Sequence, residues 1–242
     1  MKILIPTAKE LNLSAPSAIP NPPSAQTQAV LDELAAMSVA DLASFYKISS
    51  ERAEIEWQAI QALREGTAQH APALYLFDGL MYRHIKRRDY TKEESQYIEK
   101  YLAITSALYG VIPAFEPIAP HRLDFMMPLK LYGKSLKAFW KEAYDKALAE
   151  DEVIFSLLSS EFETVFSKEI RQRMIGFKFL ENRAGQLKVH STISKKARGE
   201  FLTALITNQV TEIEQMKKLS FAGFTYRSDL SSDQELVYVK EV

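Results

Sequence analysis

Residues 174–193 read MIGFKFLENRAGQLKVHSTI, and this stretch decides which class of fold the chain can adopt. Apolar and polar residues alternate over 174–180 and again over 187–193, which is the two-residue period of a strand. Asn182-Arg183-Ala184-Gly185, between the two runs, is typical of a turn. We therefore expect a β-hairpin here, with a connection longer than two residues.

Strands and helices are interspersed along the rest of the chain, with a second strand pair at 221–226 and 235–240 around a Ser/Asp loop. Hairpins place antiparallel strands in a sheet, so the pattern favours a mixed sheet with helices packed around it. We expect an α/β fold that forms one compact domain over residues 1–242. Further strands are expected at 2–6, 73–77, 122–127 and 153–158. Helices are expected at 194–207 and after the capping residues Ser38, Thr91, Ser135 and Ser160. The helix that begins after Thr91 is expected to end at Gly110.

The composition is that of an ordinary globular protein, with 47% hydrophobic and 25% charged residues among 242. The chain has no cysteine, which excludes disulfides and thiolate metal sites. No apolar run approaches the ~20 residues of a membrane helix, and the first residues do not form a signal peptide. We expect a cytoplasmic protein that does not contact a membrane.

The formal net charge of −1 indicates no particular partner, so only the distribution of charge is informative. Residues 168–200 contain nine Lys or Arg and three Asp or Glu, a local charge of +6, whereas residues 1–70 carry −3. A second basic cluster lies at 82–89, where it forms either a surface loop that aids solubility or a phosphate-binding patch. Its members are Arg83, His84, Lys86, Arg87 and Arg88.

Lys195, Lys196 and Arg198 lie near the start of the helix expected at 194–207, where the helix macrodipole disfavours cations. An anion at that helix start would compensate, because free backbone N–H groups point there. Gly199 would let the backbone of a ligand approach closely. The alternative is a solvated face whose charges are paired elsewhere.

Residues 45–53 invite comparison with a helix-hairpin-helix, a motif that binds DNA phosphates through backbone N–H groups of a tight turn. The apolar residues, the short turn and the alanine have suitable spacing, within an element near 39–64. Lys47 and Ser49 stand where the motif has glycines, and Ser50 follows them. The alternative is an ordinary corner between two helices.

His121, Arg122 and Asp124 follow a proline-rich stretch. His and Asp serve acid–base chemistry, and Arg holds carboxylate or phosphate through two hydrogen bonds. An ion pair between Arg122 and Asp124 on one face of a strand explains them equally well. Glu161 is a weaker candidate, since a capping box at Ser160 accounts for its position. A polar pocket is nevertheless possible, and its members would be Lys9, His121, Arg122, Asp124 and Glu161, together with Lys196 and Arg198.

Other chemical motifs are absent from the sequence. It contains no glycine-rich phosphate loop and no G-x-S-x-G elbow. We expect no metal site and no cofactor, because the four histidines have no ligand spacing. They are His70, His84, His121 and His190.

Five stretches in register resemble the bacterial peroxide stress protein YaaA family, and they span nearly the whole chain. The stretches are MKILIPTAKEL at 1–11, ALYGVIP at 107–113, HRLDFM at 121–126, SKKARG at 194–199, and GFTY at 223–226 with the Ser231/Ser232 loop. The resemblance implies a cytoplasmic protein that protects cells against hydrogen peroxide and is associated with limiting free iron.

The resemblance also implies binding of double-stranded DNA, through a positively charged cleft and a helix-hairpin-helix-like element on an unusual α/β fold. Asp78 and Leu80 stand where family members often carry Lys and Asp. The DNA contacts expected from the likeness are Lys195, Lys196, Arg198 and Gly199, with Lys47, Ser49 and Ser50 as a second support.

The family has no assigned reaction, so the catalytic residues are unknown and we expect a DNA-binding monomer rather than an enzyme. The alternative is an enzyme or binding protein for a phosphorylated or nucleotide-like small ligand, held in the polar pocket. An extended basic groove would favour DNA, whereas a deep enclosed pocket would favour the small ligand.

Overall fold

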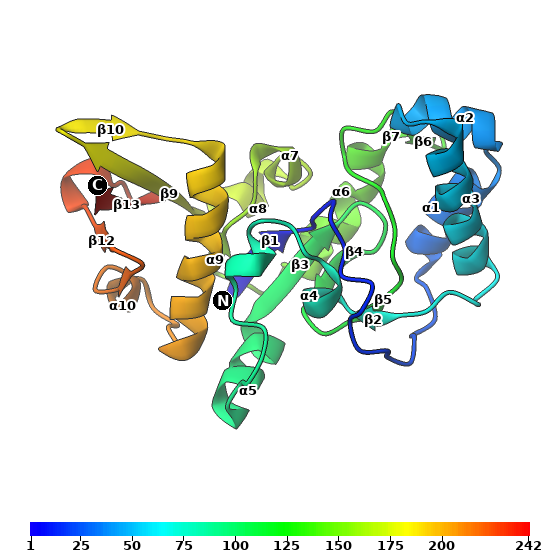
Figure 1. Ribbon diagram of the computed structural model, residues 1–242. Coiled ribbons are helices and arrows are strands. Elements are labelled where there is room, and N and C mark those ends of the chain that lie inside the picture. The colour runs from blue at the N-terminus through cyan, green and yellow to red at the C-terminus, as the bar shows by residue number, and fades with distance from the viewer.

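A computed structural model describes residues 1–242 and shows one α/β domain built on a nine-stranded mixed sheet (Figure 1). The five central strands are parallel and the strands at both edges are antiparallel, which confirms the expected fold class. The strand order is β11 (Ser220–Phe221), β12 (Phe224–Tyr226), β13 (Glu235–Glu241), β9 (Met174–Arg183), β8 (Ile154–Ser156), β1 (Lys2–Pro6), β3 (Leu102–Ser106) and β4 (Gly110–Pro113), with β10 (Gln186–Lys188) paired to β9.

The central strand β1 is buried on both faces, as its apolar sequence predicts. Ile3, Leu4 and Ile5 are each 0% exposed. Because side chains alternate along a strand, Ile3 and Ile5 join the hydrophobic core on one face, and Leu4 joins the core on the other.

Helices cover both faces of the sheet and bury these two cores (Figure 1). None of the helices combines the length and the apolar character needed to cross a bilayer. The core that contains Ile3 includes side chains of α4 (Ala73–Leu76), α5 (Lys92–Tyr101), α9 (Ser191–Thr207) and α10 (Ile213–Met216). The core that contains Leu4 includes side chains of α1 (Ala25–Ala35), α2 (Val39–Tyr46), α3 (Ser50–Arg64), α6 (Leu136–Ala147), α7 (Ser160–Glu163) and α8 (Lys168–Gln172).

Short elements connect the layers of the domain. The 3-10 helix η1 (Tyr82–His84) lies beside α9, and a second one, η2 (Ser228–Leu230), precedes the last strand. Two small antiparallel pairs lie outside the main sheet: β2 (Ala71–Pro72) with β5 (Pro117–Ile118), and β6 (Lys130–Leu131) with β7 (Lys134–Ser135).

The helix starts expected from capping residues are confirmed at three positions. Ser38 and Thr91 each form a complete capping box, and the Ser135 side chain accepts a hydrogen bond from the N–H of Ala138. The capping box expected at Ser160 is wrong, because α7 begins after Ser159 without a side-chain cap. Its Glu163 instead accepts a hydrogen bond from Ser156, at 2.5 Å.

The strand expected at 73–77 is a short helix, α4. Its N-terminal amides do not bond to a sheet: the N–H groups of Ala73 and Leu74 donate to the carbonyls of Glu116 and Ala114. Ala73, Leu74 and Leu76 are all buried. A short run of residues that are all apolar shows no hydrophobic periodicity, so the sequence pattern does not distinguish a helix from a strand here.

The helix expected to run from Thr91 to Gly110 ends at Tyr101, and the next five residues form β3. All five residues of β3 are buried between β1 and β4, and this tertiary pairing overrides the helical spacing. Gly110, at φ +81°, begins β4, where a Cβ would lie 2.8 Å from the Trp140 ring.

The hairpin at 174–193 is present, but its turn and its second strand differ from expectation. Arg183 pairs directly with Gln186, so the connection has two residues, Ala184 and Gly185, both at positive φ as in a type I′ turn. The second strand, β10, ends at Lys188, because α9 already begins at Ser191. No strand forms at 122–127, where the chain is irregular.

Candidate functional site

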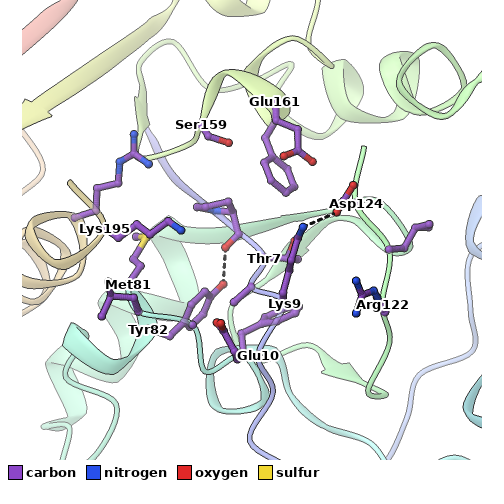
Figure 2. Close-up of a pocket in the computed structure, with 18 of the residues that line it drawn as sticks. Thr7, Lys9, Glu10, Met81, Tyr82, Arg122, Asp124, Ser159, Glu161 and Lys195 are labelled. Carbon is purple, nitrogen blue, oxygen red and sulfur yellow. Dashed lines mark hydrogen bonds and ion pairs between the residues drawn. The ribbon is translucent and has the colours of Figure 1, made fainter. Parts of the chain in front are cut away.

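A pocket with a cavity volume of about 280 Å³ lies where the central strand β1 ends (Figure 2). Strand β1 pairs with β3 on one side and with β8 on the other, so the chain's successive crossovers leave it in opposite directions. Ligands of open α/β sheets bind at such a switch point, outside the carboxyl ends of the strands. The lining comes from residues 6–10, 77–82, 121–124 and 159–162, and from Lys195 and Arg198 of α9.

Close packing of two loops forms the floor of the pocket. A Cβ on Gly79 would lie 2.7 Å from the Cβ of Ala8, so only glycine allows this approach without a shift. The buried Tyr82 hydroxyl donates a 2.8 Å hydrogen bond to the carbonyl of Pro6, which fixes the end of β1. Figure 2 shows Tyr82 beneath the β1 end with this bond drawn.

Lys9 and Asp124 form an ion pair at one side of the pocket, with Nζ and Oδ2 3.3 Å apart (Figure 2). The side chain of Lys9 is 72% exposed, whereas that of Asp124 is 14% exposed. The other oxygen of Asp124 accepts a hydrogen bond from the Met126 N–H. The carboxylate is therefore held by its own loop, while its cationic partner can swing away.

Glu161, on α7, lies beside Asp124, which comes from the loop at 121–124. Burial, followed by the negative charge of Asp124, raises the pKa of the Glu161 carboxyl. One of its oxygens, Oε1, accepts a 3.0 Å hydrogen bond from the Phe125 N–H. Two neighbouring carboxyls in different environments can give and accept protons, which is the arrangement that general acid–base chemistry uses.

His121 is held neutral within the pocket wall. Burial lowers its pKa to about 4, opposed by the carbonyl of Ala119, which lies 2.9 Å from Nδ1. Because a carbonyl only accepts, Nδ1 carries the proton and donates. The ring packs edge-on against Phe77 and Tyr109, with centroids 6.0 and 5.1 Å apart. His121 thus has a structural role, and one edge of its ring still lines the pocket.

Arg122 connects the pocket to helix α2. Its carbonyl accepts a 2.6 Å hydrogen bond from the Tyr46 hydroxyl, and its guanidinium lies 5.5 Å from the centre of the Tyr46 ring. The expected ion pair with Asp124 does not form, and no other carboxylate lies within ion-pair distance of Arg122. Its Nε is buried without a hydrogen-bond partner.

Arg198 and Lys195 form the opposite wall of the pocket, one helical turn apart on α9. The Nε of Arg198 is also buried without a partner, and the residue forms no ion pair. Burial lowers the pKa of its guanidinium, partly offset by the charge of Glu163. An arginine remains charged in proteins, so this buried N–H donor is costly unless an acceptor meets it.

The predicted anion site at a helix start is wrong in its geometry. Helix α9 begins at Ser191, so Lys195, Lys196 and Arg198 all lie beyond its first turn, where the macrodipole no longer disfavours them. Gly199 also does not face a ligand: a Cβ there would lie 2.3 Å from the Met81 carbonyl oxygen. Its role is to let α9 pack directly on η1.

This packing places the two basic clusters of the sequence next to each other. Lys195 and Lys196 lie one turn before Gly199 on the same side of α9, and hence beside η1. Several basic residues of the second cluster already have a carboxylate partner: Arg83 and Arg87 pair with Asp78, Lys86 with Glu94, and His84 contacts Glu200. Arg88 of the second cluster forms no ion pair, and neither do the residues Lys195, Lys196 and Arg198 of the first cluster.

The corner between α2 and α3 lies on the other side of β1 from α9 (Figure 1). Lys47 takes the left-handed conformation, at φ 54°, and the Ser49 side chain caps α3, which begins at Ser50. The exposed carboxylate of Glu51 lies in the same corner, in the first turn of α3. The structure therefore does not bring this turn together with Lys195, Lys196 and Arg198.

The side chains expected in a polar pocket do meet. Lys9, His121, Arg122, Asp124 and Glu161 all line it, as does Arg198, whereas Lys196 does not. No group of three His, Asp or Glu side chains is arranged to hold a metal ion. Further lining residues were not identified from the sequence, among them Thr7, Glu10, Met81, Tyr82 and Ser159. The end of the buried strand at residue 6 was the signal that could have identified Thr7 and Glu10, which directly follow it.

Comparison with known proteins gives a consistent family. A family model described as peroxide stress protein YaaA matches residues 1–230. A protein of Streptococcus sanguinis strain SK36, named UPF0246 protein, is 92% identical over 242 residues and covers 100% of both chains. Proteins of the same name from Streptococcus pneumoniae strains CGSP14 and G54 are 64% and 65% identical, again over 100% of both chains.

Proposed function

The chain belongs to the peroxide stress protein YaaA family, and from this premise we propose that it acts by binding the phosphate backbone of double-stranded DNA. Bound in this way, it helps to limit the damage that iron and peroxide cause to DNA. The proposed phosphate contacts are made by Lys195 and Lys196 of α9 and by Arg88 of the loop that follows η1.

One observation supports this proposal above the others: two basic clusters, more than 100 residues apart in sequence, lie together because Gly199 rests on η1. Lys195, Lys196 and Arg88 are exposed and form no ion pair. Lysines and arginines free of carboxylate partners release counterions from DNA when they bind its phosphates. The affinity should therefore be salt-dependent and largely independent of base sequence.

The α2–α3 corner is the proposed second contact. Free amides at the start of α3, around Ser49 and Ser50, can donate to a phosphate. The nearby charge of Glu51 weakens this contact. We therefore assign it a smaller share of the affinity than the surface of α9 and η1.

A gel-shift titration of the full chain with duplex DNA at low salt tests the proposal. The wild-type protein should retard the duplex, and the triple variant K195A/K196A/R198A should bind more weakly while keeping its circular dichroism spectrum. Equal retardation by the two proteins would remove the assignment. A triple variant that also loses its fold is replaced by K195A/K196A, whose side chains are exposed.

The pocket supports a second function beside DNA binding: recognition of a small phosphorylated or nucleotide-like ligand. Its volume of about 280 Å³ lies near the lower end of ligand sites, and its polar groups converge from four loops and a helix. The unpaired Nε atoms of Arg122 and Arg198 favour an anionic ligand.

A further inference from the structure

The two sides of the pocket differ in how their charges are paired. Lys195 and Arg198 of α9 have no carboxylate partner on one side. Asp124 and Glu161 lie on the other side, where Lys9 pairs with Asp124 and Arg122 packs on the Tyr46 ring. Figure 2 shows Lys195 across the pocket from Asp124, with Ser159 and Glu161 along the upper rim. A ligand that matches this division carries negative charge at one end and hydrogen-bond donors at the other.

The α9 side suits a phosphate monoester. Arg198 has a buried Nε–H without a partner, and an anionic oxygen is the acceptor that forms the strongest hydrogen bonds with a guanidinium. Lys195 adds a second positive charge, and Ser159, on the neighbouring loop, adds a hydroxyl. The charge of Glu163 near Arg198 does not reach ion-pair distance, so the guanidinium remains available.

The opposite side suits N–H or O–H donors. Glu161 uses Oε1 for the Phe125 N–H and keeps Oε2 as a free acceptor. Asp124 uses Oδ1 for the Met126 N–H, and its Oδ2 becomes available when a ligand displaces the exposed Lys9. Between the two sides, Phe77, Leu123 and Phe162 provide apolar surface for a ring. Lys9 is paired with Asp124 at this end, whereas Lys195 and Arg198 have no carboxylate partner, so we expect the phosphate to bind at the α9 side.

Building on the proposed small-ligand function, we propose that the pocket binds a phosphate monoester of a polar ring. The phosphate lies against Arg198, Lys195 and Ser159, and the donor groups of the ring bond to Asp124 and Glu161. A nucleoside 5′-monophosphate and a pentose phosphate share this chemistry. They differ in whether the ring is a base or a sugar, and the experiment below separates them.

Isothermal titration calorimetry of the full chain compares AMP, GMP, CMP, UMP, ribose 5-phosphate, the four nucleosides and inorganic phosphate. At least one phosphorylated ring should bind about tenfold or more tightly than its unphosphorylated form and than inorganic phosphate. Preference for a nucleotide over ribose 5-phosphate identifies the ring as a base. Absence of binding by every phosphorylated ring at millimolar concentration would overturn both this inference and the small-ligand function.

Variants test the orientation of the ligand. In R198Q, and independently in the exposed-site variant K195A, the phosphorylated ring should bind no more tightly than the unphosphorylated ring. In E161A, the phosphorylated ring should bind no more tightly than inorganic phosphate. The control is K196A, on the same helix but outside the pocket, which should bind the ligand as the wild type does. If both R198Q and K195A retain wild-type affinity, the orientation is wrong even though the pocket binds ligand.

Duplex DNA binding is measured on the same variants, so that the two proposed functions fail separately. K196A should weaken DNA binding and spare the small ligand, and E161A should do the opposite. Loss of both activities in K196A would contradict the assignment of the ligand to the pocket.

Discussion

Gly199 of α9 lies so close to Met81 that a Cβ on the glycine would be 2.3 Å from the carbonyl oxygen of Met81. The same Cβ would be 2.7 Å from the Cβ of His84, so one neighbour belongs to η1 and the other, Met81, directly precedes it. This contact joins a helix near the end of the chain to a loop near residue 80. It also places Lys195 beside Met81 in the pocket wall.

The variant G199A should therefore destabilise the protein, although alanine is normally the better helix residue. The clash is with backbone atoms that cannot rotate away, and such overpacking costs about 1–3 kcal/mol in the free energy of unfolding. Urea denaturation measures the change. T192A, at an exposed position of the same helix, is the control and should alter stability by less than about 0.5 kcal/mol. A fully stable G199A would show that α9 does not rest on η1.

His121 should make stability depend on pH between about 4 and 6.5. The folded protein lowers the pKa of this histidine from 6.5 to about 4, so the unfolded chain takes up the proton first as pH falls. Stability is thus full above 6.5 and declines down to about pH 4. A shift of this size corresponds to about 3 kcal/mol, which we reduce to roughly 2 kcal/mol because one ring edge is accessible to water.

Urea denaturation of wild type and H121Q across this pH range checks the histidine effect. The difference in unfolding free energy between the two proteins should shrink by roughly 2 kcal/mol from pH 7 to pH 4, because glutamine does not titrate. A difference that stays constant with pH would mean that His121 is not buried as a neutral ring.

Glu161 should behave in the opposite sense. Its pKa is raised in the folded protein, so the folded state binds the proton first as pH falls, and the ionised carboxyl costs stability at neutral pH. E161Q removes the repulsion from Asp124 and can still accept the Phe125 N–H. It should raise the free energy of unfolding at pH 7 by less than about 1 kcal/mol, the usual scale for interactions between partly exposed charges.

The gain in E161Q should vanish at about pH 4, where the wild-type carboxyl is itself protonated. E169Q provides the contrast, because the pKa of exposed Glu169 is lowered by hydrogen bonds at the start of α8. E169Q should therefore not raise the free energy of unfolding at neutral pH. If E161Q is less stable than wild type at both pH values, Glu161 serves structure rather than the pocket.

Local signals account for the parts of the fold that were predictable from sequence. Strand β1 is an uninterrupted apolar run, and the capping boxes at Ser38 and Thr91 depend only on residues three apart. Strand β3 was missed because its pairing with β1 joins segments about 100 residues apart. Helix α4 was missed because its first amides bond to residues 114 and 116, which no local pattern reveals.

The site divides in the same way. Acid–base and anion-binding residue types identified Arg122, Asp124 and Glu161, and the structure brings them to one pocket. The early start of α9 at Ser191 changed the meaning of the lysines, from residues at a helix end to residues on a surface beside η1. Neighbouring residues of a helix point about 100° apart, and only the structure shows that Lys195 lines the pocket whereas Lys196 does not.

The most direct test of DNA binding by α9 is the salt dependence of duplex affinity, measured by fluorescence anisotropy for wild type and K195A/K196A. Each phosphate contact contributes about −0.9 to the slope of log affinity against log salt, so losing two contacts should reduce the magnitude of the slope by roughly 2. The control K141A/K146A removes the same charge from the exposed surface of α6 and should leave the slope unchanged. Equal slopes for wild type and K195A/K196A would contradict the proposed contact of α9 with DNA.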